Sequence, residues 1–445
     1  MRRIWIKILA FLIILFVTAA AGAETVTLTL EEAIRRALDQ SLNLKKNAID
    51  LAQTEYSATH LWSEIFPTFS LGAGLTFLPS TPLFTDPGYK YKTESLSYSL
   101  SFGISLSVNP SLSSSMKRIE LAYRAQLLSY EQASKQLEIQ VIKNFLNLNT
   151  RKENITYVKE SQDLAEQKLN KDKIARENGL LSELAWLNSR LSAETARYNL
   201  SKAQGTYQNA LREFLALLGM DAGTEINFKG TIEIAPMLAD PEQLILEYLP
   251  KRPDIVEQRQ TIERLELSKN ITTLTNRSPT LELGTSWRGG SSSGKKPNGL
   301  TNPFTDNLSG SLSLRIPIDS WIPGTKQNQT VRAANAEIEK ARIDLQNKES
   351  NAKTQIRSLV SNLNSTWANL EIARLRVEFA ERTVEATEEG FNKGTVEFQE
   401  LEDKRNDLTS YRQQLLQGEY DYQSLILDLA SALNVDWRTL TRGLP

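Results

Sequence analysis

The segment Ser95–Val108 reads S-L-S-Y-S-L-S-F-G-I-S-L-S-V and alternates between two kinds of side chain without a break. Every even position from Leu96 to Val108 is apolar, and every odd position from Ser95 to Ser107 is Ser or Gly. A period of two predicts an extended strand with two unlike faces. About ten tilted residues are enough for a transmembrane β-strand. Taken alone, the pattern favours one half of a soluble sandwich, so the rest of the chain has to decide.

Three further segments repeat this alternation: 69–78, 280–288 and 307–318. Glu282 and Arg315, charged residues inside these segments, both fall on the face that carries small residues. A cation facing lipid at mid-depth costs about 2–4 kcal/mol. A charge on the apolar face would therefore have argued against a membrane sheet. The pattern therefore favours one lipid-facing side and one open, polar side.

Two long stretches contain neither Gly nor Pro, Ser111–Asn178 and Thr325–Glu389. At ~1.5 Å per residue, about 65 helical residues measure roughly 100 Å, about three times the thickness of a bilayer core. Gly179 and Gly394 follow these stretches, and a second helical pattern follows each glycine. We expect two long helical hairpins in which each glycine supplies the positive φ of a tight turn.

The chain is an internal duplication, since Pro67 recurs as Pro279 and Gly179 as Gly394 at nearly constant offsets. Each half reads helix, strand, loop, strand, long helix, turn, helix, with breaks near 40–43 and at 252–254. The predicted divisions are a signal peptide at 1–23, a first repeat at 24–219 (strands 69–78 and 95–108, tip at 179), a connector or belt at 220–241, a second repeat at 242–434 (strands 280–288 and 307–318, tip at 394) and a tail at 435–445.

The N-terminus has the form of an export signal, with Arg2, Arg3 and Lys7 before an apolar run and Ala21-Gly22-Ala23 as the cleavage site. The competing interpretation, a membrane anchor, is disfavoured by the shortness of the apolar run.

The composition excludes most chemistry. The chain has no Cys and one His, and 52 Lys and Arg nearly balance 53 Asp and Glu. Thiol chemistry is therefore excluded, and we expect no catalytic site, no cofactor, no metal site and no nucleic-acid partner.

Four strands cannot close a barrel, because small membrane barrels need about eight. Identical copies must complete the sheet, and a trimer supplies twelve strands. The expected fold class is mainly α with a small β part.

The ordered set of these elements resembles the TolC family of outer-membrane efflux ducts. The resemblance rests on the strand entries at Pro67 and Pro279, the R-P-D-I of Arg252–Ile255 and the turns at Gly179-Leu180-Leu181 and Gly394-Thr395-Val396. The resemblance covers essentially the whole mature chain. It implies a homotrimer with a 12-stranded barrel in the outer membrane, a helical barrel in the periplasm, and docking to a periplasmic adaptor and an inner-membrane pump.

The resemblance also implies roles for residues at the second tip. Glu400 and Asp403 match the family's acidic ring positions, and Phe391 matches an aromatic that helps to hold the periplasmic mouth closed. Val396 stands where a well-known member carries an arginine, so the salt bridge of that arginine is not expected here. The alternative for the acidic residues is an ordinary solvated helix face, because Glu397 and Glu402 crowd the same stretch.

Apolar tip residues carry a second hypothesis. Leu180, Leu181 and Val396 either contact an adaptor, together with Gly179, Gly394 and Thr395, or only staple the turns. The function expected for the chain is a passive outer-membrane channel-tunnel of a multi-component efflux or type I secretion system. The alternative function is a periplasmic coiled-coil scaffold or adaptor protein.

Overall fold

The computed structural model describes residues 26–78, 95–224, 226–229, 235–237, 239–292 and 304–441. The predicted signal peptide and the loops at 79–94 and 293–303 lie outside these residues, as do parts of the connector and the tail. Residue contacts divide the chain into two compact units. The helical unit comprises Met1–Ala48, Ser129–Val256 and Lys348–Pro445, and the sheet unit comprises Ile49–Leu128 and Glu257–Asn347. Each unit thus takes corresponding pieces from both predicted repeats.

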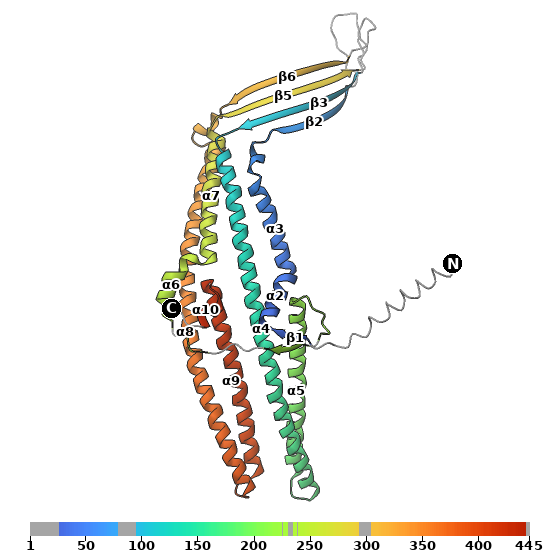
Figure 1. Ribbon diagram of the computed structural model, residues 1–445, viewed down its shortest axis with the longest axis vertical. Coiled ribbons are helices and arrows are strands. Elements are labelled where there is room, and N and C mark those ends of the chain that lie inside the picture. Colours follow the sequence, from blue (N-terminus) through green and yellow to red (C-terminus); the bar gives the residue numbers. More distant parts are fainter. Residues whose placement is uncertain are drawn as a thin grey trace, which may run out of the picture. The chain divides into compact units, whose positions relative to one another are not determined.

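The sheet unit contains one four-stranded antiparallel sheet, in which the strands lie side by side (Figure 1). Its strands are β2 (Thr68–Leu78), β3 (Ser95–Val108), β5 (Thr280–Ser292) and β6 (Thr305–Arg315), in the order β2-β3-β5-β6. All four strands were expected from the alternation. The last residue differs from the prediction in β5 and β6, because the glycines after Arg288 continue the ladder and Pro317 cannot donate to it.

Gly290 explains why a glycine pair stands inside a strand. A Cβ at this position would lie 2.5 Å from the carbonyl oxygen of Tyr98 on the neighbouring strand. The backbones approach too closely there for any side chain. The glycine pair therefore belongs to β5, although sequence alone favours a loop at this point.

The helices follow the expected order, and Ser41 separates α2 from α3. Thr29 caps the N-terminus of α2, where its Oγ1 accepts a hydrogen bond from the amide of Glu32 at 3.3 Å. Their bounds are α2 (Leu30–Gln40), α3 (Leu42–Thr59), α4 (Leu112–Glu177), α5 (Glu183–Leu217), α6 (Pro241–Tyr248), α7 (Pro253–Arg277), α8 (Lys326–Asn392), α9 (Phe398–Leu433) and α10 (Trp437–Thr441), with short 3₁₀ turns at Leu61–Ile65, Leu249–Lys251 and Asp319–Trp321. The two longest, α4 and α8, contain 66 and 67 residues.

Within the helical unit, α5, α4, α9 and α8 run side by side in that order (Figure 1). Arg197 of α5 pairs with Glu166 of α4, and Lys143 of α4 pairs with Asp428 of α9. Arg412 of α9 pairs with Glu381 of α8. One apolar core joins α2, α4 and α5, and a second joins α6, α8, α9 and α10.

A two-stranded parallel pair adds to this unit. It joins β1 (Val26–Thr29) to β4 (Ile226–Lys229). The apolar residues around Ile226 and Ile232 predict short strands in the connector, of which the first is β4 and the second lies outside the described residues. The strand β1 was not expected. The N-terminal strand is too short for its period to stand out in the sequence.

No helix among the residues described combines the length and the apolarity needed to cross a membrane.

Candidate functional site

The register of the sheet separates two faces along all four strands. Odd positions of β3 pair with even positions of β5, as in Ser105 with Gly284, and these pair with odd positions of β6, as in Gly284 with Ser311. One face is therefore almost entirely Ser, Thr and Gly. The other face is apolar, with exposed side chains that include Leu71, Leu75, Phe102, Leu283, Leu308 and Leu312.

Three charged residues lie on the hydroxyl-bearing face. Glu282 is opposite Ser107 and Ser313, and Arg315 is opposite Thr280, as the alternation predicted. Arg288 is opposite Ser101 and Asn307. It was not counted among the strand charges, because the predicted strand ended at that residue. Asp306 lies on the other face, where its carboxylate accepts from Nε1 of Trp287 at 3.4 Å.

Both hairpin tips close with the same backbone motif. Gly179 and Gly394 have φ values of 74° and 76°, so the expected positive φ is confirmed. The amide of Leu180 donates to the carbonyl of Ala175 at 2.8 Å, and that of Thr395 donates to Gly390 at 2.9 Å. This six-to-one bond is the Schellman motif, which places a glycine just beyond the helix.

The two tips differ in what they expose. Leu180 is 80% exposed, whereas Leu181 is half-buried. Val396 is also half-buried and packs over Gly390, where an added Cβ would lie 2.6 Å from a Val396 methyl group. Leu180 is thus the most exposed of these apolar tip residues.

The residues matched to the family's mouth lie close together at the second tip. Phe391 and Phe398 pack with ring centroids 5.7 Å apart, and Lys171 of α4 places its Nζ 3.3 Å from the Phe398 centroid. Glu400 and Asp403 are exposed on α9, and Asp403 accepts from the side chain of Gln399 at 2.9 Å.

Glu402 differs from its acidic neighbours because it is buried, with only 3% of its surface exposed. Lys168 of α4 forms an ion pair with it at 3.0 Å and also donates to Gln399. Burial raises the pKa of Glu402, the pair with Lys168 lowers it, and Asp172 and Asp403 raise it, so the net shift is upward. The alternative considered from the sequence, a solvated acidic helix face, does not hold for Glu402, which is buried. No local signal marks it, because its partner is more than two hundred residues away.

A groove of about 870 Å³ runs beside this ion pair. Small and polar residues of three helices line it, such as Ser161 of α4, Thr195 of α5 and Asn406 of α9. The groove therefore separates the two hairpins on one side, while Lys168 and Glu402 connect them.

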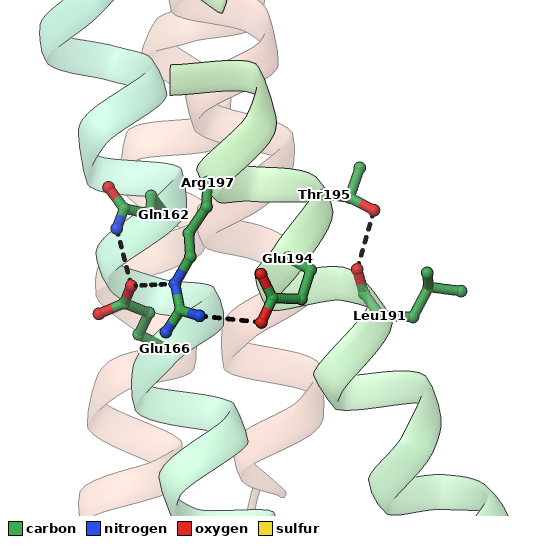
Figure 2. A network of polar contacts seen from close by, with 6 residues as sticks. All are labelled: Gln162, Glu166, Leu191, Glu194, Thr195 and Arg197. Carbon is green, nitrogen blue, oxygen red and sulfur yellow. Dashed lines mark hydrogen bonds and ion pairs between the residues drawn. The ribbon is translucent and has the colours of Figure 1, made fainter. Parts of the chain in front are cut away.

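The first hairpin is held by a polar network that crosses from α4 to α5 (Figure 2). Glu166 accepts from Arg197 at 2.9 Å and from Gln162 at 2.7 Å, and Arg197 also donates to Glu194 at 3.0 Å. The hydrogen bond from Arg197, aided by that from Gln162, lowers the pKa of Glu166. On α5, the side chain of Leu191 points away from α4 and is 65% exposed.

The R-P-D-I segment forms the junction between α6 and α7. Arg252 is buried and donates two hydrogen bonds to Asp254, at 3.0 and 2.8 Å, and a third to Gln355 of α8 at 3.1 Å. Pro253 begins α7, where its missing N–H costs nothing. The motif therefore has a structural role in fixing the start of this helix.

Among the described residues, no cluster of His, Asp or Glu is arranged to hold a metal ion.

The family model for outer membrane efflux proteins matches residues 33–220 and 244–435. These two ranges correspond to the two repeats of the duplication. No curated protein sequence matches the chain closely enough to count as a relative.

Solved structures of bacterial channels share the fold. The outer-membrane channel CmeC of Campylobacter jejuni aligns with a TM-score of 0.72 at 17% identity, covering 91% of this chain and 85% of that one. The open-state MtrE outer-membrane channel of Neisseria gonorrhoeae gives 0.71 at 15% identity, with 91% and 89% covered. VceC of Vibrio cholerae, an outer-membrane protein, gives 0.69 at 15% identity, with 92% and 96% covered.

The mainly α, TolC-like fold expected from the sequence is confirmed by these structures, and the family model covers both repeats. Neither comparison gives any sign of the scaffold or adaptor alternative. The chain belongs to the outer membrane efflux protein family.

Proposed function

We propose that three copies of this chain form an outer-membrane efflux channel-tunnel. Each copy would give four strands to a shared 12-stranded barrel and two helical hairpins to a tube in the periplasm. The observation that carries this proposal is the two-faced sheet, whose end strands β2 and β6 have no second partner among the described strands.

The faces of the sheet match lipid on one side and water on the other. Alternation of apolar and polar residues along each strand is typical of membrane barrels. Glu282, Arg288 and Arg315 all lie on the hydroxyl-bearing face, which avoids about 2–4 kcal/mol per cation at mid-depth. Aromatic side chains, among them Trp62, Phe66 and Trp321, are exposed close to the strands, as at a membrane interface.

A sheet of four strands leaves two unpaired edges, which neighbouring copies would fill. Closure requires about eight strands or more, and three copies would provide twelve. In this arrangement β6 of one copy pairs with β2 of the next.

The helical unit has two free edges as well, and both are apolar. On α5 the exposed residues Leu184, Leu191 and Tyr198 recur every seven positions. On α8 the exposed residues Ile372, Leu375 and Phe379 have spacings of three and four. Since α5 and α8 are the outer members of the α5-α4-α9-α8 row, the seam on α5 of one copy would pack against that on α8 of its neighbour.

The tips would form the periplasmic mouth. We assign adaptor contact to Gly179, Leu180, Leu181, Gly394, Thr395 and Val396, with the 80% exposure of Leu180 as the main support. We assign the aperture to Phe391, Val396, Glu400 and Asp403. The expected partners are a periplasmic adaptor protein and an inner-membrane pump.

Exposed carboxylates support the aperture assignment, because three copies of Glu400 and Asp403 near one axis would attract cations. A trivalent cation such as hexamminecobalt should then block the open channel. If Glu400→Ala with Asp403→Ala leaves this block unchanged, the aperture lies elsewhere.

Fractionation and conductance test the main proposal together. The protein should appear in the outer-membrane fraction as a trimer, and the purified trimer should give discrete conductance steps in a planar bilayer. A water-soluble monomer without conductance would contradict the proposal.

A further inference from the structure

One arginine stands alone on the hydroxyl-bearing face. Across the sheet, Arg288 shares its row with Gly72, Ser101 and Asn307. The rows on either side contain only Ser, Thr and Gly at their inward positions, such as Ser286 and Gly290. The Arg288 side chain is exposed, and within the part of the chain that the structure describes no carboxylate pairs with it.

The other arginine of this face has a nearby counter-charge. Glu282 is opposite Ser313, two residues before Arg315 in β6, so Glu282 and Arg315 are diagonal neighbours. Such neighbours lie about 7–8 Å apart, within reach of long side chains. The two charges largely cancel each other's field at this end of the sheet.

Arg288 is too far from Glu282 for the same compensation. The two residues are six positions apart in β5, which corresponds to about 20 Å. This separation is more than twice the Debye length of about 8 Å at physiological ionic strength. Asp306 does not compensate Arg288 either, because it lies on the apolar face beside Trp287.

We infer that Arg288 forms an anion-selecting ring inside the barrel. The inference rests on the proposed trimer, in which three copies of the arginine face one bore. It assigns to this ring the anionic groups of transported molecules, phosphates and carboxylates, which the planar guanidinium binds with two parallel hydrogen bonds. The side-chain amide of Asn307, opposite Arg288 on β6, offers a further hydrogen-bond donor.

The dimensions of a 12-stranded barrel make this ring effective. Strands about 4.8 Å apart and tilted by about 40° give a backbone radius of roughly 12 Å. An arginine stem reaches about 6 Å toward the axis, so a molecule that passes along the axis comes within about one Debye length of each guanidinium at this level. A passing anion therefore cannot avoid the field of the ring.

Block by inorganic pyrophosphate tests the inference in planar bilayers with purified channels. Pyrophosphate is added first on the barrel side and then on the other side, while single-channel conductance is recorded. Wild-type channels should be blocked from the barrel side. Arg288→Gln should raise the half-blocking concentration at least about tenfold, since each site loses a charge-assisted hydrogen-bond pair.

The matched control is Arg315→Gln, which removes the same kind of side chain at a position where Glu282 compensates the charge. Its half-blocking concentration should change less than about twofold. A conducting channel that pyrophosphate does not block, or that is blocked equally in wild type and Arg288→Gln, overturns the inference. Equal loss of block in both variants overturns it as well, because the effect would then be one of total charge. Absence of any conductance in the wild type would instead contradict the proposed function.

Discussion

The hydroxyl of Tyr422 connects α9 to the segment that precedes α6. It donates to the carbonyl of Ala235 and accepts from the amide of Met237, both at 3.0 Å. The ring is fully buried against Trp367, with centroids 5.1 Å apart. A single side chain thereby fixes the position of residues that have no regular structure of their own.

Replacing Tyr422 by Phe should lower the free energy of unfolding by about 1–2 kcal/mol. The ring and its packing remain, and only the two hydrogen bonds are lost. Thermal unfolding of purified protein measures the change, and Tyr56→Phe serves as control because that tyrosine is 66% exposed. Equal unfolding temperatures for the two variants would show that the hydroxyl of Tyr422 does not stabilise the fold.

At the scale of residues, the sequence predicted correctly those positions where the backbone geometry requires one residue type. A tight turn between helices needs a positive φ, so Gly179 and Gly394 could be identified without a structure. The burial of Glu402 could not be identified in this way. Its environment depends on Lys168 of another hairpin, and nothing near Glu402 in the sequence reports that contact.

At the scale of elements, this buried ion pair is one of the contacts that hold α4 against α9. Glu402 is nearly inaccessible, while Lys168 keeps 22% of its side chain exposed. Removing one partner of a buried pair leaves an uncompensated charge, which is more costly than never having the pair.

Lys168→Met should destabilise the protein by about 3 kcal/mol near neutral pH. The pKa of Glu402 is already raised, and loss of Lys168 raises it further. The penalty is therefore present when Glu402 is ionised and disappears as the pH falls through this raised pKa, because neutral Glu402 needs no counter-ion. Unfolding temperatures of Lys168→Met and wild type, measured at a series of pH values from neutral downward, should converge as the pH falls.

The control is the double variant Lys168→Met with Glu402→Leu, which removes both charges. It should recover most of the stability lost at neutral pH. A destabilisation by Lys168→Met that does not depend on pH would show that Lys168 acts through packing alone.

The sheet allows a test of which face meets lipid. Leu312→Arg places a cation on the apolar face and should cost about 2–4 kcal/mol. Ser311→Arg places the same side chain on the opposite face, where it should be tolerated. The yield of heat-resistant oligomer in the membrane fraction distinguishes the two variants. Equal losses in both would contradict the assignment of the faces.

Elements were predicted better than their ends. The alternation identified all four strands, because a period of two survives over ten or more residues. It did not identify the end of β5, because Gly289 and Gly290 favour a loop when the neighbouring strand is not known. The β1–β4 pair was half missed for a related reason, since its strands contain only four residues each.

At the scale of the whole molecule, two apolar seams of one copy stay exposed among the described residues. The seam on α5 includes Leu191, and the seam on α8 includes Phe379, which is 72% exposed. Their sequences show the heptad spacing but not which other helix they meet. Only the row α5-α4-α9-α8 reveals that both seams lie at free edges.

Introduced cysteines test this closure cleanly, because the chain contains no native cysteine. The double variant Leu191→Cys with Phe379→Cys, treated with a bismaleimide, should give covalent dimers and trimers. Each single variant should give neither, because the interface joins unlike surfaces. Dimers from a single variant would instead indicate a two-fold interface and contradict the ring.

The serine-rich face largely satisfies its own hydrogen-bonding groups. Ser101 donates to the carbonyl of Gly72 at 3.3 Å, Ser309 donates to Ser286 at 3.3 Å, and the hydroxyls of Thr68 and Ser105 lie 2.6 Å apart. In the proposed channel, such a wall would offer passing molecules few free hydrogen-bond donors and little apolar surface to bind. Uncharged cargo of very different chemistry would then slide past with short dwell times, and its speed would depend on its bulk more than on its polarity.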